Sequence, residues 1–229
     1  MPRKPAVPED LSAKKALALE VIARLKKEYP DAACTLDYDH AWQLLVSVRL
    51  AAQCTDARVN IVVEDLFAKY PSVAALAAAE PEEIEAIVKP CGLGHSKARD
   101  ISACMRMLRD KYDCKVPTTF EELLSLPGVG RKSANLIMGD VFGKPAIVTD
   151  THCIRLCNKI GLVDGIKEPQ KVEMALWKII PPEEGSDLCH RFVMHGRAVC
   201  NARKPECEKC CLNDICRYAR EQSGADTAQ

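Results

Sequence analysis

Four cysteines near the C-terminus have the spacing of a metal-binding loop. Cys200, Cys207, Cys210 and Cys216 are separated by six, two and five residues. Four thiolates on one short segment can surround a single tetrahedral or cubic centre. Two centres remain open: zinc, for which four-cysteine sites are common, and a [4Fe–4S] cluster, which the single close pair favours. Cys211 competes with Cys210 for the third ligand position.

A glycine-containing turn at residues 126–130 forms a second candidate site, between two predicted helices. Gly128 and Gly130 let the backbone turn tightly and approach another molecule, and we expect Val129 between them to be exposed. The N–H groups that begin the next helix carry a partial positive charge, which suits a phosphate oxygen. A plain helix–helix turn is the alternative, and the adjacent Arg131 favours the phosphate site.

Lys132 lies in the first turn of the helix that follows this hairpin. If DNA phosphates dock on the hairpin, its neutral amine could attack C1′ of a nucleoside, displace the base and form an imine. The imine acidifies the neighbouring sugar hydrogens, so the 3′ phosphate can leave by β-elimination. A solvated surface lysine is the alternative, which the position alone favours.

Asp150 stands where an N-cap would begin a helix that ends at Ile160. One carboxylate oxygen can cap the helix while the other faces a reaction site. There the carboxylate could stabilise a cationic sugar or assist the activation of a nucleophile. We assign no role to His152, because a histidine near a helix start is more often structural.

The elements that must position these residues all read as helices. Aromatic residues make up only 5% of the chain, alanine is frequent, and no segment has a convincing strand pattern. Asp56 is the expected N-cap of one helix, and residues 118–121 have the spacing of a capping box. The proline-containing residues 1–10 are expected to be a flexible lead-in, and the last few residues to be disordered. The predicted helices span residues 11–29, 40–52, 57–70, 73–79, 82–88, 96–112, 131–142, 151–160, 169–180 and 186–199. A further short helix opens at the capping box of residues 118–121 and stops at Leu126.

Composition limits the class of protein. Lys plus Arg and Asp plus Glu are both 32, so the net charge is zero and only local basic patches could bind DNA. Arg203 and Lys204, between the first two candidate ligands, form such a patch. No apolar run reaches the roughly 18 residues of a membrane span. The odd count of 13 cysteines without a signal peptide predicts a reducing cytosol, and the eight cysteines outside the tail are expected to be small buried apolar residues.

These features, in this order, resemble the endonuclease III family of helix-hairpin-helix DNA glycosylases. Residues 126–135 resemble that family's hairpin with its catalytic lysine, and residues 150–152 resemble its aspartate segment. The cysteine spacing resembles its cluster ligands. Residues 50–56 and 92–97 also match, so the resemblance extends from about Leu17 to about Tyr218.

The resemblance implies an all-α helix-hairpin-helix glycosylase fold of two helical domains, with the DNA site in the cleft between them. Residues 34–144 would form a six-helix domain that holds the hairpin. Residues 1–33 and 145–229 would form a discontinuous domain that holds the cluster loop. The cofactor would be a [4Fe–4S] cluster, with Cys210 rather than Cys211 as a ligand. The family flips the damaged base out of the duplex, and Gln53 and Leu93 would fill the hole that it leaves.

The implied activity is base-excision repair by a bifunctional glycosylase and abasic-site lyase. Lys132 and Asp150 would be catalytic, and Gly128, Val129, Gly130 and Arg131 would contact DNA. The substrate would be double-stranded DNA with an oxidised pyrimidine or an abasic site. The protein would act as a monomer, off the membrane, in the cytoplasm (at the nucleoid if the source is bacterial).

Two other functions compete with this one. In a monofunctional glycosylase, Lys132 would be silent and Asp150 would activate water; in a DNA-binding module, the hairpin and the metal loop would dock without chemistry. Lys132 separates the chain from the related mismatch adenine glycosylases, which lack a lysine there. Thr149 and Gly94-His95 depart from the family pattern and could alter the choice of lesion or opposite base.

Overall fold

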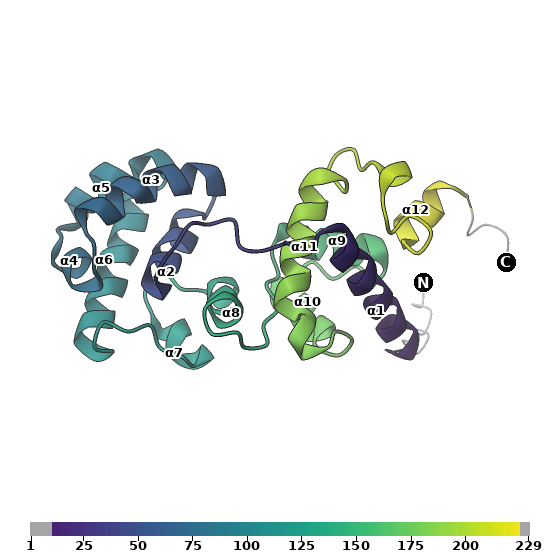
Figure 1. Ribbon diagram of the computed structural model, residues 1–229, viewed down its shortest axis with the longest axis horizontal. Helices are drawn as coiled ribbons and strands as arrows, with labels where there is room; N and C mark the ends of the chain where they lie inside the picture. Colours follow the sequence, from purple (N-terminus) through teal and green to yellow (C-terminus); the bar gives the residue numbers. More distant parts are fainter. Residues whose placement is uncertain (1–10, 225–229) are drawn as a thin grey trace, which may run out of the picture. The chain divides into compact units, whose positions relative to one another are not determined.

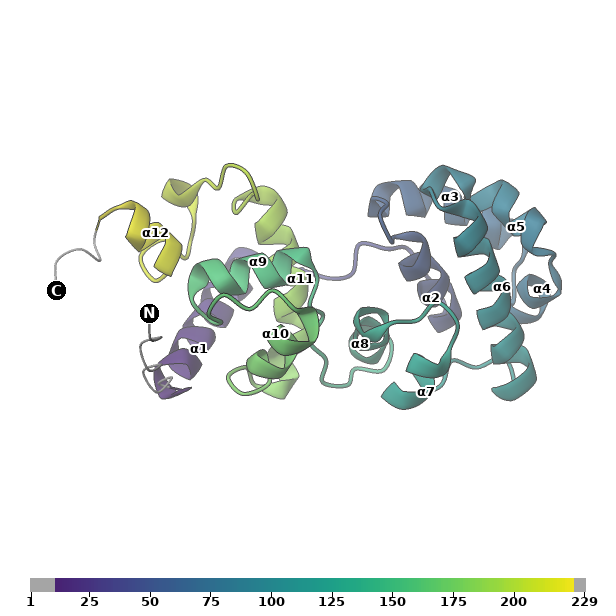
Figure 2. The ribbon, with the colours of Figure 1, turned by 180° about the vertical axis from the view of Figure 1, so that it is seen from behind.

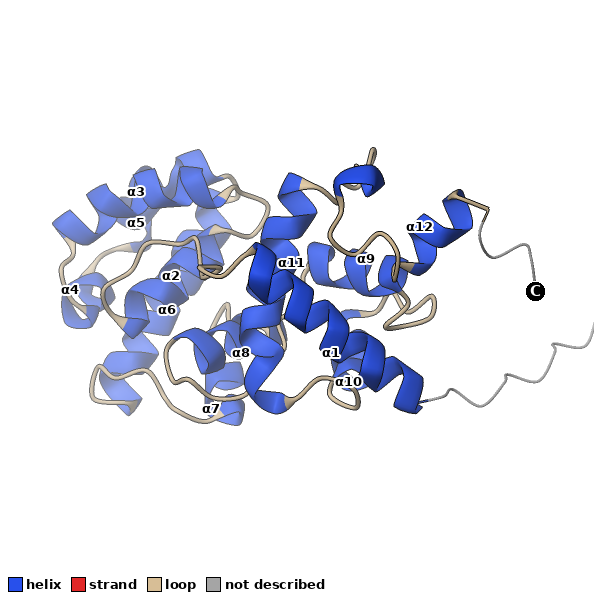
Figure 3. Ribbon diagram, turned by 45° about the vertical axis from the view of Figure 1, so that its right-hand side comes forward, coloured by secondary structure: helices blue, strands red, loops and turns tan. Residues whose placement is uncertain are grey.

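The computed structural model describes residues 11–224, and within this range every regular element is a helix (Figure 1). Figure 3 accordingly shows helices and loops and no strand in that range. The chain divides into two compact units, residues 34–144 and the pair of segments 1–33 and 145–229. None of the helices between residues 11 and 224 is long and apolar enough to cross a membrane. The expected flexible lead-in and disordered end lie largely outside the described residues.

The unit of residues 34–144 is built around α6, which lies against α4, α5 and α2 (Figure 2). Its buried core is aliphatic, with Leu44, Leu66, Ile84 and Met105 all fully covered. The helices of this unit are α2 (Ala41–Leu50), α3 (Asp56–Lys69), α4 (Val73–Ala78), α5 (Pro81–Val88), the short 3-10 helix η1 (Lys89–Cys91), α6 (Gly94–Lys111), α7 (Phe120–Ser125) and α8 (Arg131–Asp140).

Two predicted helix caps in this unit were wrong by one residue. The N-cap of α3 is Thr55 and not Asp56, because the Thr55 hydroxyl accepts the backbone N–H of Arg58 at 3.3 Å. The capping pair of α7 is Thr119 with Glu122, one position after residues 118 and 121. Thr119 accepts from the Glu122 backbone at 3.3 Å and its hydroxyl donates to the Glu122 carboxylate at 2.6 Å. In both cases an adjacent residue that can also cap a helix forms the cap instead.

The other unit joins the first described helix to the C-terminal helices. The apolar face of α1, with Val21 and Leu25, is buried, and α1 lies against α11. α11 in turn lies against α9, and Phe192 and Leu156 are buried there. The sequence prediction missed α12. The helices of this unit are α1 (Leu11–Glu28), α9 (Thr151–Ile160), α10 (Pro169–Leu176), η2 (Pro182–Glu184), α11 (Gly185–Ala198), η3 (Cys207–Lys209) and α12 (Arg217–Gln222).

The prediction that the eight cysteines outside the tail are buried holds for five of them: Cys91, Cys104, Cys153, Cys157 and Cys189. Cys34 and Cys54 are half-buried, and Cys114 is exposed. Cys114 follows Asp113 in a turn where both residues have positive φ, so its side chain stands outside the core.

Candidate functional site

The hairpin at residues 126–130 connects α7 to α8 and is closed by a hydrogen bond from the Val129 N–H to the Leu126 carbonyl at 3.1 Å. Gly128 has a φ of +75°, which side chains rarely adopt. A β-carbon there would lie 2.8 Å from the β-carbon of Asp100 and 3.1 Å from Cδ of Arg49. The fold itself therefore requires glycine at position 128.

Gly130 differs from Gly128 in having open space around it. It is the N-cap of α8, with an extended backbone that any residue adopts, and a β-carbon there would meet nothing within 4 Å. Packing within the chain gives no reason for glycine at this position. Close approach by another molecule would be such a reason. The first turn of α8, which follows Gly130 directly, provides backbone N–H groups for that molecule.

Three side chains in and beside the hairpin differ in their exposure and contacts. Val129, predicted to be exposed, is half-buried and packs against the core, because the turn folds it back toward the unit. Arg131 places its guanidinium 5.0 Å from the centre of the Phe120 ring, an arrangement that fixes the start of α8. Lys132 is the second residue of α8, in the first turn as predicted, and its side chain is exposed.

Gln53 and Leu93 share an unusual backbone. Both are exposed, Leu93 to 57%, and both have positive φ, +58° and +52°. A non-glycine residue in this region is strained, and strain of this kind persists only where the surrounding structure holds it.

Asp150 is the N-cap of α9, as predicted. Its Oδ1 accepts the Cys153 backbone N–H at 2.7 Å, and the side chain is half-buried. Between residues 11 and 224 the structure records no hydrogen bond to the second oxygen, Oδ2. The predicted cap is thus confirmed for one carboxylate oxygen, and the chemical role of the other oxygen stays a prediction.

The segment after Asp150 is held against α11 through a glycine. A β-carbon at Gly196 would stand 2.4 Å from Nδ1 of His152 and 2.8 Å from the Arg155 guanidinium. Arg155 donates to the Gly196 carbonyl at 3.2 Å and to the Cys200 carbonyl at 2.8 Å. Arg155 therefore connects the helix that begins at Asp150 to the start of the cysteine loop.

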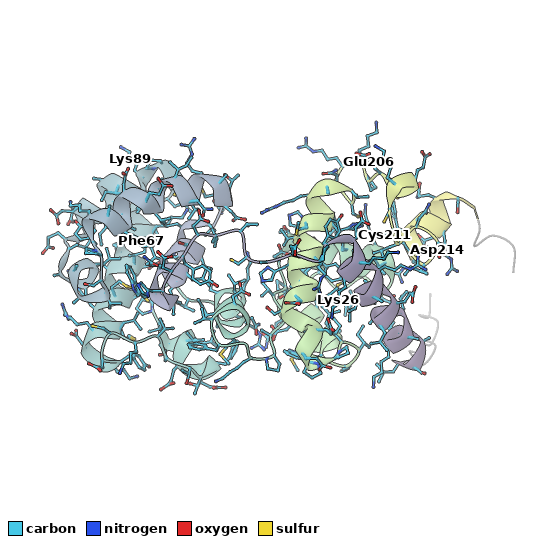
Figure 4. All side chains as sticks on the ribbon, in the orientation of Figure 1. Lys26, Phe67, Lys89, Glu206, Cys211 and Asp214 are labelled. Atoms are coloured by element: carbon cyan, nitrogen blue, oxygen red, sulfur yellow. The ribbon has the colours of Figure 1, made fainter. Side chains whose placement is uncertain are left out.

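The cysteine loop begins at the end of α11 and is pinned by further contacts. The Cys200 N–H donates to the His195 carbonyl at 2.8 Å, and the Cys216 thiol donates to the Lys159 carbonyl at 3.5 Å. Arg24 of α1 donates to the Cys211 carbonyl at 3.0 Å and pairs with Asp214 at 2.5 Å. Figure 4 shows Cys211 and Asp214 beside α1, with Glu206 farther out along the loop.

His195 marks Cys210 as different from Cys211. The buried His195 ring places Nε2 3.3 Å from the Cys210 sulfur, and its Nδ1 lies 3.1 Å from the Tyr29 hydroxyl. The Leu212 N–H also donates to the Cys210 sulfur, at 3.4 Å. Sequence reasoning missed both His195 and Arg155, because their partners are distant in the sequence. The packing of α9 against α11 brings Arg155 to the Cys200 carbonyl, and His195 contacts Tyr29 and Cys210.

The donor set of the loop fits a soft metal centre. Burial raises the pKa of the Cys200 and Cys216 thiols, and contact with the Cys211 thiol raises that of Cys210 to about 12. Thiolates are soft ligands, and iron or zinc would supply the positive charge that keeps these sulfurs deprotonated at neutral pH. In the described part of the chain, no group of three or more His, Cys, Asp or Glu is already gathered closely enough to hold a metal ion.

The predicted basic residues of the loop are on the surface. Arg203 and Lys204 are both exposed between Cys200 and Cys207. Their contact with DNA stays a prediction, as do the ligand roles of the four cysteines. The first prediction concerns the exposed basic side chains of the loop, and the second concerns its cysteine thiols.

Comparison with protein families identifies residues 46–182 as matching the HhH-GPD superfamily of base excision DNA repair proteins. Endonuclease III of Synechocystis is 43% identical over 92% of this chain and 96% of its own length. Endonuclease III of Escherichia coli is 37% identical over 89% of this chain and 96% of its own length.

Solved structures show the same likeness. A trapped endonuclease III–DNA covalent intermediate is 40% identical over 91% of this chain and 98% of its own, with a TM-score of 0.86. A non-covalent endonuclease III–DNA complex matches with the same identity and TM-score over 92% of this chain. A thermostable thymine-DNA glycosylase, 23% identical with a TM-score of 0.81, shares the fold.

Proposed function

The chain belongs to the endonuclease III family of helix-hairpin-helix DNA glycosylases, and from that premise we propose how its own residues perform the reaction. The protein is a base-excision DNA glycosylase and abasic-site lyase. Action on oxidised pyrimidines is typical of this family, and we assign this substrate class to the chain. The observation that carries the proposal is an exposed lysine, Lys132, directly after a hairpin whose Gly130 leaves its backbone open to another molecule.

Lys132 is the proposed nucleophile. Its neutral amine attacks C1′ of the damaged nucleotide, the C1′–N bond breaks, and the base leaves with a proton. Opening of the sugar ring at O4′ gives a protonated imine between C1′ and the lysine nitrogen. Loss of a proton from C2′ then expels the 3′ phosphate by β-elimination, and water releases the amine. The surface position of Lys132 leaves its side chain accessible to a flipped-out nucleotide.

Asp150 is proposed to support the step in which positive charge develops on the sugar. Because Oδ1 is held by the Cys153 N–H, the carboxylate has a fixed direction and needs no reorganisation during the reaction. Its second oxygen can face the cationic sugar or take the proton that Lys132 loses. An N-cap aspartate suits this position because one oxygen caps α9 while the other is directed to the reaction.

DNA binding is proposed to rest on local features, since the net charge of the chain is zero. Backbone N–H groups at the hairpin would take a phosphate, and Arg203 and Lys204 would contact the backbone elsewhere. Exposed Gln53 and Leu93 would enter the duplex at the position of the flipped base. These contacts position the DNA without requiring a globally basic surface.

A [4Fe–4S] cluster held by Cys200, Cys207, Cys210 and Cys216 is the proposed cofactor. When bound, it would fix the conformation of the loop. The thiol donor set and the burial of Cys200 and Cys216 support this assignment, and the hydrogen bond between His195 and Cys210 supports Cys210 as the third ligand. The chain's own contribution is the scaffold that holds the two ends of the loop: α11 holds Cys200 through the His195 carbonyl, and α9 holds Cys216 through the Lys159 carbonyl.

The test is borohydride trapping with three proteins on two duplexes, one with thymine glycol and one with an abasic site. The proteins are the wild type, Lys132→Ala, and Lys115→Ala as a matched control on an exposed lysine of the same unit. We expect covalent complexes on both duplexes with the wild type and the control, and none with Lys132→Ala.

The other outcomes are informative in different ways. Trapping that persists in Lys132→Ala overturns the assignment of the nucleophile. Base release from thymine glycol without any trapping overturns the lyase mechanism and points to a glycosylase that uses water. Binding of either duplex without base release or strand cleavage overturns the enzymatic proposal altogether.

A further inference from the structure

The described charged residue with the most complete burial lies beside the two strained loops. Lys97 is 0% exposed, although lysine is almost never fully buried without a partner. Its Nζ donates to the Leu50 carbonyl at 2.8 Å and to the Cys91 carbonyl at 2.8 Å. Both partners are neutral, and burial lowers the pKa of the Lys97 amine. Such a placement is costly for stability, so it calls for a reason.

The two carbonyls are the ends of two helices. Leu50 is the last residue of α2, and Cys91 is the last residue of η1. The final carbonyls of a helix have no partner within the helix and carry a partial negative charge, which a cation stabilises. Lys97 therefore caps two helix C-termini with one amine. Figure 2 shows α6, which carries Lys97, beside α2 and α5.

Each capped helix leads directly into one strained loop. Gln53 follows the end of α2 by three residues and has a φ of +58°. Leu93 follows the end of η1 by two residues and has a φ of +52°. The backbone N–H of Lys97 also donates to the Leu93 carbonyl at 3.0 Å. Lys97 thus makes three hydrogen bonds at these loops: two to the ends of the helices that lead into them, and one to the Leu93 carbonyl.

We propose that Lys97 is a positioning residue, which holds the Gln53 loop and the Leu93 loop in a fixed mutual arrangement for insertion into duplex DNA. The proposal rests on the proposed function, in which these two side chains fill the place of the flipped base. Lys97 does not touch the DNA. It acts by keeping two exposed side chains in strained backbone conformations before DNA arrives, so that the ordering is not required during binding.

The role predicts a specific pattern of loss. Filling the hole in a base stack requires an intact duplex, whereas strand cleavage at an abasic site in single-stranded DNA requires only the lysine chemistry. A displaced Gln53 or Leu93 therefore impairs excision from a duplex and spares cleavage of a single strand. A general loss of structure would impair both reactions equally.

The experiment compares Lys97→Met with the wild type and with Lys111→Met, a matched change of an exposed lysine on the same helix. Methionine keeps the length and apolar stem of lysine and removes the donors. We expect single-turnover excision of thymine glycol from a duplex to fall about tenfold or more, as a misplacement of around 1 Å can cause. Cleavage of a single-stranded abasic oligonucleotide should stay within about twofold of the wild type. Lys111→Met should match the wild type on both substrates.

Amide hydrogen exchange supplies a second measurement without DNA. In Lys97→Met, the amides of residues 51–54 and 92–94 should exchange faster while the core of α6 stays protected. If Lys97→Met fails to fold, Lys97→Gln replaces it, because its amide can still donate to one carbonyl. Equal losses on both substrates, or no loss on the duplex, would overturn the proposal. A wild type inactive on both substrates would instead refute the proposed function.

Discussion

A β-carbon at Gly128 would stand 2.8 Å from the β-carbon of Asp100. Asp100 is itself held by Arg49, whose Nε donates to it at 2.7 Å, so neither side chain can move aside easily. The hairpin is thus fitted against an ion pair between α2 and α6. Gly130, two residues later, has no such neighbour within 4 Å. Packing within the chain therefore requires glycine at only one of the two positions of this motif.

Gly128→Ala and Gly130→Ala should therefore have different effects. Gly128→Ala should lower the free energy of unfolding by at least about 1–2 kcal/mol, the usual cost of a left-handed backbone with a side chain. Gly130→Ala should leave thermal unfolding nearly unchanged and weaken binding to a duplex with a reduced abasic site. Binding by Gly130→Ala at wild-type affinity would show that the open space at this position is not used by DNA.

Asp150→Asn should uncouple capping from catalysis. Asparagine is as good an N-cap as aspartate, so thermal stability should change little. Loss of the negative charge should slow base excision by about 10²-fold or more, in the range for a positioned acid–base or electrostatic group.

Asp150→Ala is the companion variant, because it loses the cap as well and should cost about 1 kcal/mol of stability. Single-turnover excision and thermal unfolding of both variants give the comparison. An Asn variant that is fully active but an Ala variant that is not would mean that the aspartate acts only through α9.

Cys210→Ser should lose the iron–sulfur chromophore, and Cys211→Ser should keep it. His195 and the Leu212 N–H both contact the Cys210 sulfur, whereas Cys211 is tied to α1 through its backbone carbonyl, which a serine retains. Visible absorbance and iron content of the purified variants check the assignment. A brown Cys210→Ser protein would show that Cys211 and not Cys210 is the third ligand. A colourless wild type that contains zinc would show that the metal centre is zinc and not an iron–sulfur cluster.

Gly196→Ala tests the packing of α9 against α11, because the variant should lose thermal stability where this substitution in a helix normally increases it. In a helix interior, alanine normally stabilises by about 0.5–1 kcal/mol relative to glycine. Here the added carbon would meet the stiff His152 ring at 2.4 Å and would displace Arg155 from the Cys200 carbonyl. We therefore expect lower thermal stability and faster loss of iron to a chelator. Increased stability would show that α9 and α11 separate without cost.

Local features of the sequence predicted much of the fold. Caps and glycine stops are set by neighbours in the chain, so the start of α9 at Asp150 and the turn before α8 were predicted correctly. Errors such as Asp56 for Thr55 arose where adjacent residues can both cap. The family resemblance, rather than any pattern in the residues, pointed to Gln53 and Leu93.

Long-range contacts explain what the sequence did not reveal. A lysine in the first turns of a helix reads as a solvated surface residue, yet Lys97 is buried because a carbonyl 47 residues away completes its site. His195 likewise depends on Tyr29, 166 residues away. Neither contact produces a periodic or compositional pattern in the sequence. Only the folded chain therefore shows that Lys97 and His195 are buried and bonded to distant residues.

The interrupted unit has a consequence for synthesis on the ribosome. α1 emerges well before the helix that covers its Val21 and Leu25 face, because α11 is made more than 150 residues later. Residues 34–144 can bury their own core in the meantime, as domains generally fold as units during translation. The nascent chain must therefore carry an uncovered apolar helix until α11 is made, and the cysteine loop follows only after α11.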